Sequence, residues 1–233
     1  MKLLSIQVAL PREHGHAGAE RVMERPWTTA FHKEPVSGPV FLARTNLDGD
    51  RQGDPEHHGG PDKAVLAYAA SHYPLWREEL GRILPFGGFG ENFTVEGADE
   101  STVCLGDVYA VGEARVQVSQ PRIPCWKIAR RWGIKDLSAH VQRTRRTGWY
   151  LRVLVEGHVQ AGDDIVLLDR PHPDWPVLRA SDVLYTRPHD VDAVRALAAV
   201  PALAPGLSQA LERYFAQAAV PPDEPRLLGP NTE

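Results

Sequence analysis

Cysteine is scarce in this chain, whose 233 residues include only Cys104 and Cys125. The apolar opening, residues 1–10, lacks both the basic region and the small-residue cleavage site of a secretory signal, so it resembles a first strand. Disulfides belong to oxidising compartments, and nothing in the sequence indicates one. We therefore expect two reduced thiols in a cytoplasmic protein.

Long apolar runs and an excess of positive charge are also missing. No apolar run approaches the roughly 20 residues that a membrane helix needs. The formal net charge is -4 and the isoelectric point is about 6.2, so the chain would gain little from counterion release on a nucleic acid. Neither a membrane nor a nucleic acid is expected as a partner.

What is present is the pattern of a β-rich globular body. The 20 glycines and 20 prolines favour many turns. Alternating or β-branched segments predict strands at 3–10, 27–31, 39–43, 64–68, 93–95, 108–111, 115–119, 149–155 and 157–168. Helical spacing predicts helices at 73–84, with Ser71 as N-cap, at 128–132 and at 136–144. The sequence thus predicts a mainly β (α+β) domain over residues 1–168.

The composition changes after Asp169. Three prolines between residues 169 and 180 indicate a linker. Helical patterns then occupy 181–185, 191–200 and 205–218, with Asp190 as the expected N-cap of the second helix. These segments predict a three-helix extension over residues 181–218. The polar, proline-rich residues 219–233 are expected to form a flexible tail.

The first candidate for chemistry is the segment around Cys125, Gln-Pro-Arg-Ile-Pro-Cys-Trp-Lys over residues 120–127. Its two prolines stiffen the backbone, and Arg122 and Lys127 are cationic neighbours that favour a thiolate. A thiolate is both a nucleophile and a metal ligand. The alternative is an inert, buried thiol packed beside Trp126. Cys104 has no such neighbours and is assigned to the core.

The second candidate is the polar loop over residues 46–62, where a long irregular stretch separates two apolar segments. His57 and His58 are followed by a Gly-Gly pair that lets the backbone approach a ligand closely. Lys63 then brings a positive charge that suits a phosphate. Asp54 and the two histidines could also supply some zinc ligands, although spacing alone is a weak signal. A solvated loop explains the same residues.

The third candidate is the run Gly-Gly-Phe-Gly-Glu-Asn-Phe-Thr over residues 87–94. Three glycines around one aromatic suggest a nest of backbone N–H groups for an anion, and Gly-x-Gly-x-x-Gly is absent. Glu91 could act in proton transfer, and Asn92 could position a ligand. A tight turn with a capping asparagine is the alternative.

The order of these motifs resembles MOSC-domain proteins of the YiiM-like branch. The similarity is carried by Asp-Gly-Asp-x-Gln-x-Asp, His-His-Gly-Gly-x-Asp-Lys-Ala, Gly-x-Phe-Gly-Glu-Asn-Phe-Thr-Val, Gly-Asp and Gln-Pro-Arg-x-Pro-Cys-x-Lys. The motifs are dense over residues 48–127 and looser to about residue 168. The helical stretch from residue 181 to about 215 is similar to the three-helix extension of this branch.

This resemblance implies a β-barrel-like body that binds a molybdenum cofactor, a molybdopterin, with Cys125 as the metal ligand; pyridoxal phosphate is not expected. It places Arg122, Lys63, Asn92 and Gly90 as cofactor-binding residues. Cys125, Glu91 and His58 become the catalytic candidates. The implied reaction is the reduction of N-hydroxylated compounds, such as hydroxylamino base analogues, in detoxification. An electron-donor reductase protein and a homodimer partner are the other implied partners.

Other functions fit the same residues. Cys125 could hold a persulfide or pass on a ligand in a non-catalytic cofactor or sulfur carrier. It could also be the nucleophile of a hydrolase with His57, His58 or His158 as the base, although no nucleophile elbow surrounds it. A zinc enzyme built on the aspartate–histidine loop is the last alternative. The extension could pack for solubility or dock an electron-donor protein or a dimer partner.

Overall fold

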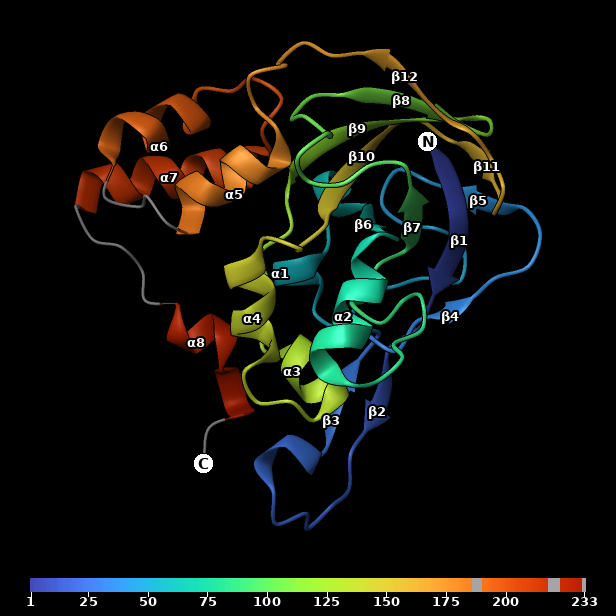
Figure 1. Ribbon diagram of the computed structural model, residues 1–233, viewed down its shortest axis with the longest axis vertical. Coiled ribbons are helices and arrows are strands. Elements are labelled where there is room, and N and C mark those ends of the chain that lie inside the picture. The colour runs from blue at the N-terminus through green and yellow to red at the C-terminus, as the bar shows by residue number, and fades with distance from the viewer. Residues whose placement is uncertain (186–189, 218–222, 232–233) are drawn as a thin grey trace.

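The computed structural model describes residues 1–185, 190–217 and 223–231. Within these residues the chain forms a mostly-sheet body followed by helices at its C-terminal end (Figure 1). This arrangement agrees with the mainly β (α+β) body and C-terminal helices that the sequence predicts.

The body is built on one large mixed sheet. Across the described residues this sheet has eight strands in the order β12-β8-β9-β10-β6-β7-β1-β4. The strands are β1 (Lys2–Val8), β4 (Glu34–Pro35), β6 (Val65–Ala69), β7 (Phe93–Glu96), β8 (Val108–Val111), β9 (Ala114–Pro121), β10 (Trp149–Val155) and β12 (Ile165–Asp169). The β6–β7 pair is parallel, and its neighbours on both sides are antiparallel.

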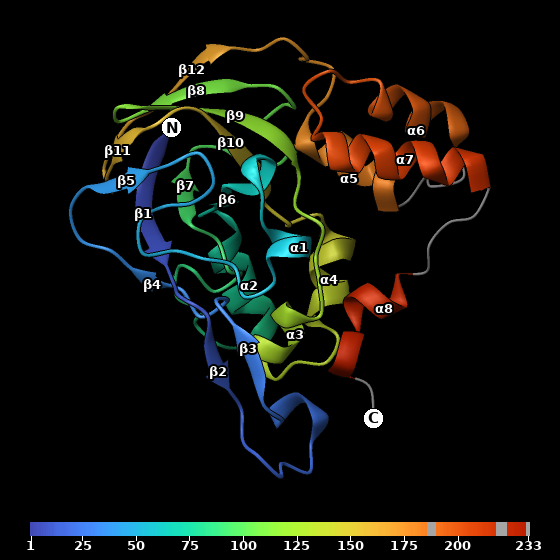
Figure 2. The ribbon, with the colours of Figure 1, turned by 180° about the vertical axis from the view of Figure 1, so that it is seen from behind.

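Two small sheets accompany the large one. β5 (Val40–Leu42) pairs with β11 (Gly157–Val159), and β2 (Arg12–His14) pairs with β3 (Trp27–Thr29). The β2–β3 hairpin extends away from the large sheet, past α3, in both views of the molecule (Figures 1 and 2). The sequence pattern did not predict β2 or β4, because their residues, Arg-Glu-His and Glu-Pro, include no β-branched or aromatic side chain typical of strands.

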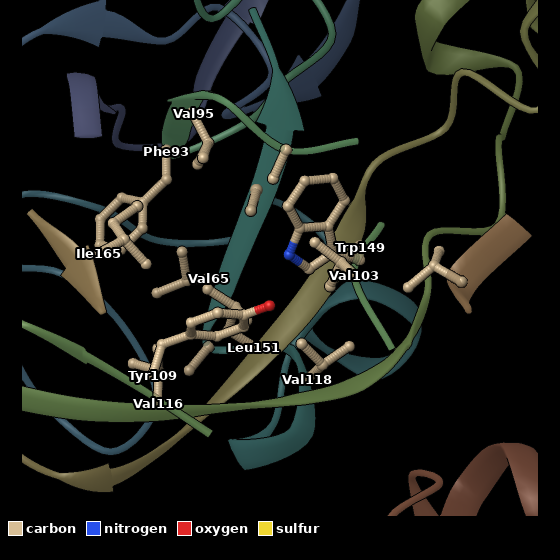
Figure 3. Close-up of a cluster of buried hydrophobic side chains, with 14 of the residues drawn as sticks. Val65, Phe93, Val95, Val103, Tyr109, Val116, Val118, Trp149, Leu151 and Ile165 are labelled. Carbon is tan, nitrogen blue, oxygen red and sulfur yellow. The ribbon is translucent and has the colours of Figure 1, made fainter. Parts of the chain in front are cut away.

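The main core fills the space enclosed by the large sheet. Aliphatic and aromatic side chains from β6, β7, β8, β9, β10 and β12 meet there with almost no exposure (Figure 3). Val65, Phe93, Val116, Trp149 and Leu151 are examples. Alternation is clearest in the first half of β9, whereas β6 is buried along its whole length, as its continuous apolar sequence indicates.

A second core cluster supports the helices at the lower end of the body. It joins α2 (His72–Leu80), α3 (Lys127–Trp132) and α4 (Leu137–Thr144) around Tyr68, Trp76 and Phe89. The prediction for α2 was too long, because Gly81 takes a left-handed φ of 64° and ends the helix. Ser71 occupies the N-cap position of α2 as predicted, but its side chain makes no capping hydrogen bond.

The C-terminal helices follow β12. They are α5 (Val177–Tyr185), α6 (Val191–Ala198) and α7 (Pro205–Gln217). The carboxylate of Asp190 accepts a hydrogen bond from the backbone N–H of Ala193, which confirms the predicted N-cap. α5 begins inside the segment expected to be a linker, because the buried residues Val177 and Ala180 continue its apolar face. Residue 218, the predicted end of the third helix, lies outside the described residues.

The expected flexible tail contains further structure. Residues 219–222 and 232–233 lie outside the described residues, but α8 (Glu224–Leu227) and a 3-10 turn (Gly229–Asn231) form between them. Figure 1 shows α8 beside α4. Hydrogen bonds join this segment to the body, among them one from Trp126 N to Arg226 O at 2.8 Å. Tertiary contacts therefore hold a stretch that has no helical period of its own.

Candidate functional site

One pocket gathers residues from all three candidate motifs. The space between its walls, including its open mouth, is about 580 Å³. Three short elements form its rim: α1 (Pro55–His58), a 3-10 turn (Pro61–Lys63) and the loop between β9 and α3. The lining residues are Thr29, Ala30, Phe31, Lys33, Arg51, Gln52, Gly53, Asp54, His58, Lys63, Leu66, Gly90, Asn92, Arg122, Cys125, Lys127 and Tyr150.

Cys125 lies directly after the end of β9, at the wall of this pocket. The residue is 7% exposed, so the thiol meets the pocket from a closely packed position. Its carbonyl oxygen accepts hydrogen bonds from Ser138 Oγ at 2.8 Å and from Ile128 N at 3.2 Å. Cys104 is 3% exposed and lies outside this pocket, which confirms its assignment to the core. The chain therefore presents one of its two thiols to a cavity.

The pocket is positively charged. Five cationic side chains line it, namely Lys33, Arg51, Lys63, Arg122 and Lys127, while Asp54 is the one acid in its described lining. Two of these cations have partners: Lys33 pairs with Asp50 behind the wall, and Lys127 lies 3.5 Å from Asp54. The remaining excess of positive charge favours an anionic ligand.

Arg122 is the least satisfied of these cations. It is 3% exposed, and its Nη2 donates a hydrogen bond to Phe89 O at 3.3 Å. Its Nη1 is buried and has no hydrogen-bond partner in the part of the chain that the structure describes. A buried guanidinium N–H without an acceptor is costly, and a bound anion would supply the missing acceptor.

Lys63 and His58 also reach the pocket, as expected. Lys63 Nζ donates to His57 O at 2.7 Å, and burial lowers the pKa of this lysine. Burial, followed by the charge of Lys127, lowers the pKa of His58 to about 3. His58 is therefore a neutral imidazole at physiological pH, able to donate or accept one hydrogen bond but not to carry an extra proton.

Asn92 and Gly90 line the pocket, but their contacts are mainly structural. The amide of Asn92 donates to Gln7 O and to Asp50 Oδ2, and its oxygen accepts from Leu66 N at 3.1 Å. Gly90 has a φ of 78°, and a Cβ there would lie 2.8 Å from the ring of Phe31. Asn92 therefore positions the pocket wall, and only glycine fits at residue 90.

Glu91 differs from its expected catalytic role. It is fully buried outside the pocket lining, and its carboxylate accepts hydrogen bonds from Gly87 N at 2.6 Å and Phe89 N at 3.0 Å. The hydroxyls of Tyr73 and Thr94 donate to the same group. All of its acceptor capacity is thus used to shape the glycine turn. We expected the backbone N–H groups of this turn to bind an anionic ligand, but they bind the carboxylate of Glu91.

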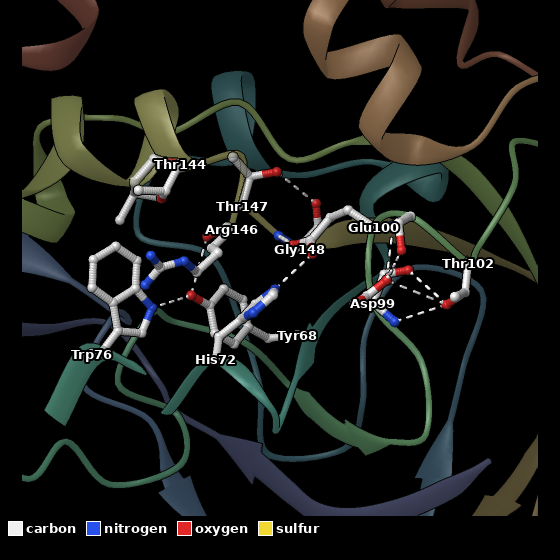
Figure 4. A network of polar contacts seen from close by, with 12 residues as sticks. Tyr68, His72, Trp76, Asp99, Glu100, Thr102, Thr144, Arg146, Thr147 and Gly148 are labelled. Atoms are coloured by element: carbon white, nitrogen blue, oxygen red, sulfur yellow. Dashed lines mark hydrogen bonds and ion pairs between the residues drawn. The ribbon is translucent and has the colours of Figure 1, made fainter. Parts of the chain in front are cut away.

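A second buried network, which includes Glu100 and Gly148, supports the backbone of the Arg122 segment (Figure 4 shows the network). One carboxylate oxygen of Glu100 accepts a hydrogen bond from Gly148 N at 2.6 Å. The other oxygen pairs with His72 Nε2, also at 2.6 Å. Gly148 O in turn accepts from Arg122 N at 3.0 Å. The network therefore fixes the position of the Arg122 backbone in the pocket wall.

Sequence reasoning missed several lining residues. Lys33 and Thr29 come from near β3, far from the motifs in sequence, and Tyr150 comes from β10. Tyr150 pairs across the sheet with Gln120, so the strand register would have placed it beside the cysteine motif. Burial raises its pKa to about 12, which keeps the phenol protonated as a hydrogen-bond donor.

Comparisons with known proteins agree with this architecture. The family model described as "MOSC domain" matches residues 54–166, and the model described as "YiiM-like, 3-alpha helix domain" matches residues 175–218. The first match covers all three candidate motifs except the beginning of the polar loop. The second covers α5, α6 and α7.

Individual relatives extend over more of the chain. It is 47% identical over 169 residues to "Uncharacterized protein YflK" of Bacillus subtilis, covering 72% of this chain and 75% of that protein. It is 38% identical over 164 residues to a protein named "Reductase" from Gibberella moniliformis, of which the match spans 29%. The crystal structure of YiiM from Geobacillus stearothermophilus has 33% sequence identity and a TM-score of 0.76, covering 91% of this chain and 97% of that one.

These matches identify the family of the chain and its branch within that family. The chain belongs to the MOSC-domain family, whose domains are associated with binding of the molybdenum cofactor. Within that family it has the YiiM-like three-helix domain after the MOSC domain, as the order of its motifs suggested.

The alternative sites find less support. Among the residues that the structure describes, no three His, Cys, Asp or Glu side chains are grouped as a metal site requires, so the zinc alternative lacks ligands. His158 lies on β11, exposed and bonded to Glu113 through Nδ1 at 3.0 Å, and it does not line the pocket of Cys125. No helix in the described ranges has the length and apolarity to cross a bilayer.

Proposed function

We propose that this chain binds the molybdenum cofactor through Cys125 and reduces N-hydroxylated small molecules. The observation that carries the proposal is the pairing, in one pocket, of a thiol with a buried guanidinium that lacks an acceptor. A thiolate is a suitable ligand for a soft metal centre, and an unpaired arginine N–H suits a phosphate oxygen. The family association of MOSC domains and the relative named a reductase point the same way.

The residues of the pocket fit such a group. The cofactor is anionic, and Arg122, Lys63 and Lys127 surround the wall beside Cys125. When bound, it would supply the two-electron chemistry, while the protein supplies orientation and charge. Cys125 would hold the metal, and Arg122 Nη1 would donate to the phosphate.

Other groups of this pocket would orient the substrate. Burial raises the pKa of Tyr150 and keeps its hydroxyl protonated, so Tyr150 can donate a hydrogen bond to an oxygen in the pocket it shares with Cys125. His58 is neutral and can hold an N-hydroxyl group without transferring a proton to it. The packing around the 7%-exposed cysteine limits access of water from behind.

The proposed reaction cleaves the N–O bond of a hydroxylamine. It consumes two electrons and two protons, converts the N–OH group to N–H, and releases the oxygen as water. The electrons must come from a donor reductase protein, and the protons come from solvent through the open mouth of the pocket. A reducing cytoplasm, where Cys125 stays a free thiol, is the compartment that fits this chemistry.

Elemental analysis tests the proposal most directly. Wild-type protein, Cys125→Ser and Cys104→Ser are purified from a host that makes the cofactor, and molybdenum and hydroxylamine reduction are measured with a chemical electron donor. We expect molybdenum and activity in the wild type and in Cys104→Ser, which carries the same change in the core. Cys125→Ser should lose both.

Each other outcome removes part of the proposal. Full activity in Cys125→Ser would exclude the sulfur ligand. If the protein binds molybdenum but reduces no hydroxylamine, the cofactor site stands and the carrier alternative is favoured. A labile sulfur adduct on Cys125 in place of molybdenum, detected by mass spectrometry, would favour a sulfur carrier.

A further inference from the structure

The loop that carries Cys125, residues 122–126, is held by a segment outside both family matches. These matches cover residues 54–166 and 175–218, whereas residues 223–231, here called the C-terminal strap, follow them. The strap contains α8 and the last 3-10 turn. Figure 1 shows it beside α4 and at a distance from α7, which precedes it in sequence.

The strap binds both peptide groups that flank Cys125. On one side, Arg226 Nη1 donates a hydrogen bond to Pro124 O. On the other, Trp126 N donates to Arg226 O at 2.8 Å. A single residue therefore fixes the backbone immediately before and after the cysteine.

The guanidinium of Arg226 is itself held in place. Its Nη2 donates to Gln142 Oε1 at 2.6 Å and also contacts the carboxylate of Asp223. Gln142 Nε2 completes the set by donating to Asp223 Oδ2 at 2.6 Å. Because α4 contributes Gln142, this set ties the strap to the body, and Arg226 is presented to Pro124 in one orientation.

Two further contacts close the strap over Trp126. Asn231 is 5% exposed, and its Nδ2 donates to Trp126 O at 3.0 Å. Gly229 packs so closely that a Cβ would lie 2.3 Å from Cδ1 of the indole, and its φ of 49° also favours glycine. At Gly229 the backbone of the strap therefore packs directly against the indole of Trp126.

The three-helix extension reaches the other end of the same loop. Tyr185, at the end of α5, donates from its hydroxyl to Arg122 O at 3.4 Å. Its ring also lies 5.9 Å from the guanidinium of Arg226. The extension and the strap therefore meet at Tyr185, and together they support the loop from Arg122 to Trp126.

We infer that the C-terminal strap sets the position of the Cys125 sulfur, with Arg226 as the positioning residue. This inference rests on the proposed function for the role of that sulfur, but not for the contacts themselves. The loop contains Pro124 and directly follows Pro121, and neither proline can donate a backbone hydrogen bond, so partners outside the loop must fix it. Arg226 provides one of each.

Thiol alkylation tests the strap without any cofactor. The full chain is purified from a host that lacks the cofactor, and iodoacetamide modification of Cys125 and Cys104 is followed separately by peptide mass spectrometry. Arg226→Ala frees the loop, and we expect Cys125 to react about tenfold faster, as the loss of a charged hydrogen bond implies. The Cys104 rate should not change, since that thiol lies in the core.

Matched variants separate positioning from stability. Arg226→Lys keeps a donor for Pro124 O and should restore part of the wild-type Cys125 rate. Asn231→Ala removes one contact and should give a smaller increase. Arg213→Ala, an exposed arginine on α7, should leave both rates unchanged.

Two results would overturn the inference. The first is an unchanged Cys125 rate in both Arg226→Ala and Asn231→Ala. The second is an equal acceleration of Cys125 and Cys104, which would mean that the strap only stabilises the fold. The alkylation assay contains neither molybdenum nor substrate. Its result therefore stands even if the proposed function is wrong, and a negative alkylation result does not exclude the proposed function.

Discussion

The glycine turn at residues 87–92 and the cysteine loop at residues 122–126 are both candidate sites in the sequence, yet they differ in how their polar groups are satisfied. In the turn, the Glu91 carboxylate accepts from two backbone N–H groups and two hydroxyls. In the loop, Arg122 keeps a buried Nη1 with no acceptor among the described residues. A buried group with all its partners builds the structure, whereas one that lacks a partner and also lines a pocket is a candidate contact for a ligand.

The largest expected effect is the removal of Glu91. Glu91→Ala leaves several buried donors without an acceptor, so the free energy of unfolding should fall by about 3 kcal/mol. Urea denaturation followed by tryptophan fluorescence measures it. Glu96→Ala, an exposed control at the end of β7, should change stability by less than about 0.5 kcal/mol. If Glu91→Ala kept its stability and lost only activity, the contrast between turn and loop would fail.

Arg122 should show the opposite behaviour. Arg122→Met removes a buried charge that lacks one partner, so stability should stay close to wild type, while affinity for the cofactor falls about 30-fold. Retention of molybdenum after serial dilution and gel filtration measures that affinity. Arg115→Met, an exposed change on the same strand β9, is the control. Unfolding of Arg122→Met together with normal cofactor retention would reverse the assignment.

His58 sharpens the comparison through pH. Its pKa falls to about 3 in the folded chain and returns to about 6.5 on unfolding, so the unfolded state binds the proton first as pH decreases. The protein should therefore lose stability below pH 6.5, with His58 contributing about 2 kcal/mol of that loss at pH 5. His58→Gln should lose less stability than the wild type between pH 7 and pH 5. An equal loss of the free energy of unfolding in both proteins between these two pH values would contradict the buried, neutral imidazole.

The smallest effect lies in the extension, far from the pocket. Asp190→Ala removes the N-cap of α6 and should lower the free energy of unfolding by about 1 kcal/mol. Asp192→Ala, two residues further along in the first turn of the helix and with a side chain 95% exposed, is the matched control. Hydroxylamine reduction should be unchanged in both variants, because α6 contributes no residue to the pocket lining.

The sequence was sufficient for most strands and for the convergence of most motif residues. An alternating pattern located β10, whereas β6 was located as a short apolar run, because all five of its residues are buried. The ordered motifs identified the MOSC-domain family and predicted one pocket for Cys125, Arg122, Lys63, His58, Asn92 and Glu91, all of which line it except Glu91.

Other features depend on long-range geometry. The role of Glu91 follows from the way residues 87–90 turn their N–H groups toward it, which no local pattern encodes. Lys33 reaches the pocket from another part of the chain, and its carboxylate partner Asp50 belongs to the polar loop. The strap has a helix of only four residues, too short for a periodic signal, and its contacts with Trp126 span about half the chain length.

The parallel pairing of β6 and β7 has a consequence for how the pocket forms. Parallel neighbours cannot be joined by a hairpin, so Phe93 meets Ala67 only after residues 70–92 have been closed into a crossover. That crossover contains α2 and the glycine turn, which includes the pocket residue Gly90. Closing it costs chain entropy before the contacts compensate, which makes such pairings slow. The centre of the sheet and one wall of the pocket should therefore assemble in the same late step of folding.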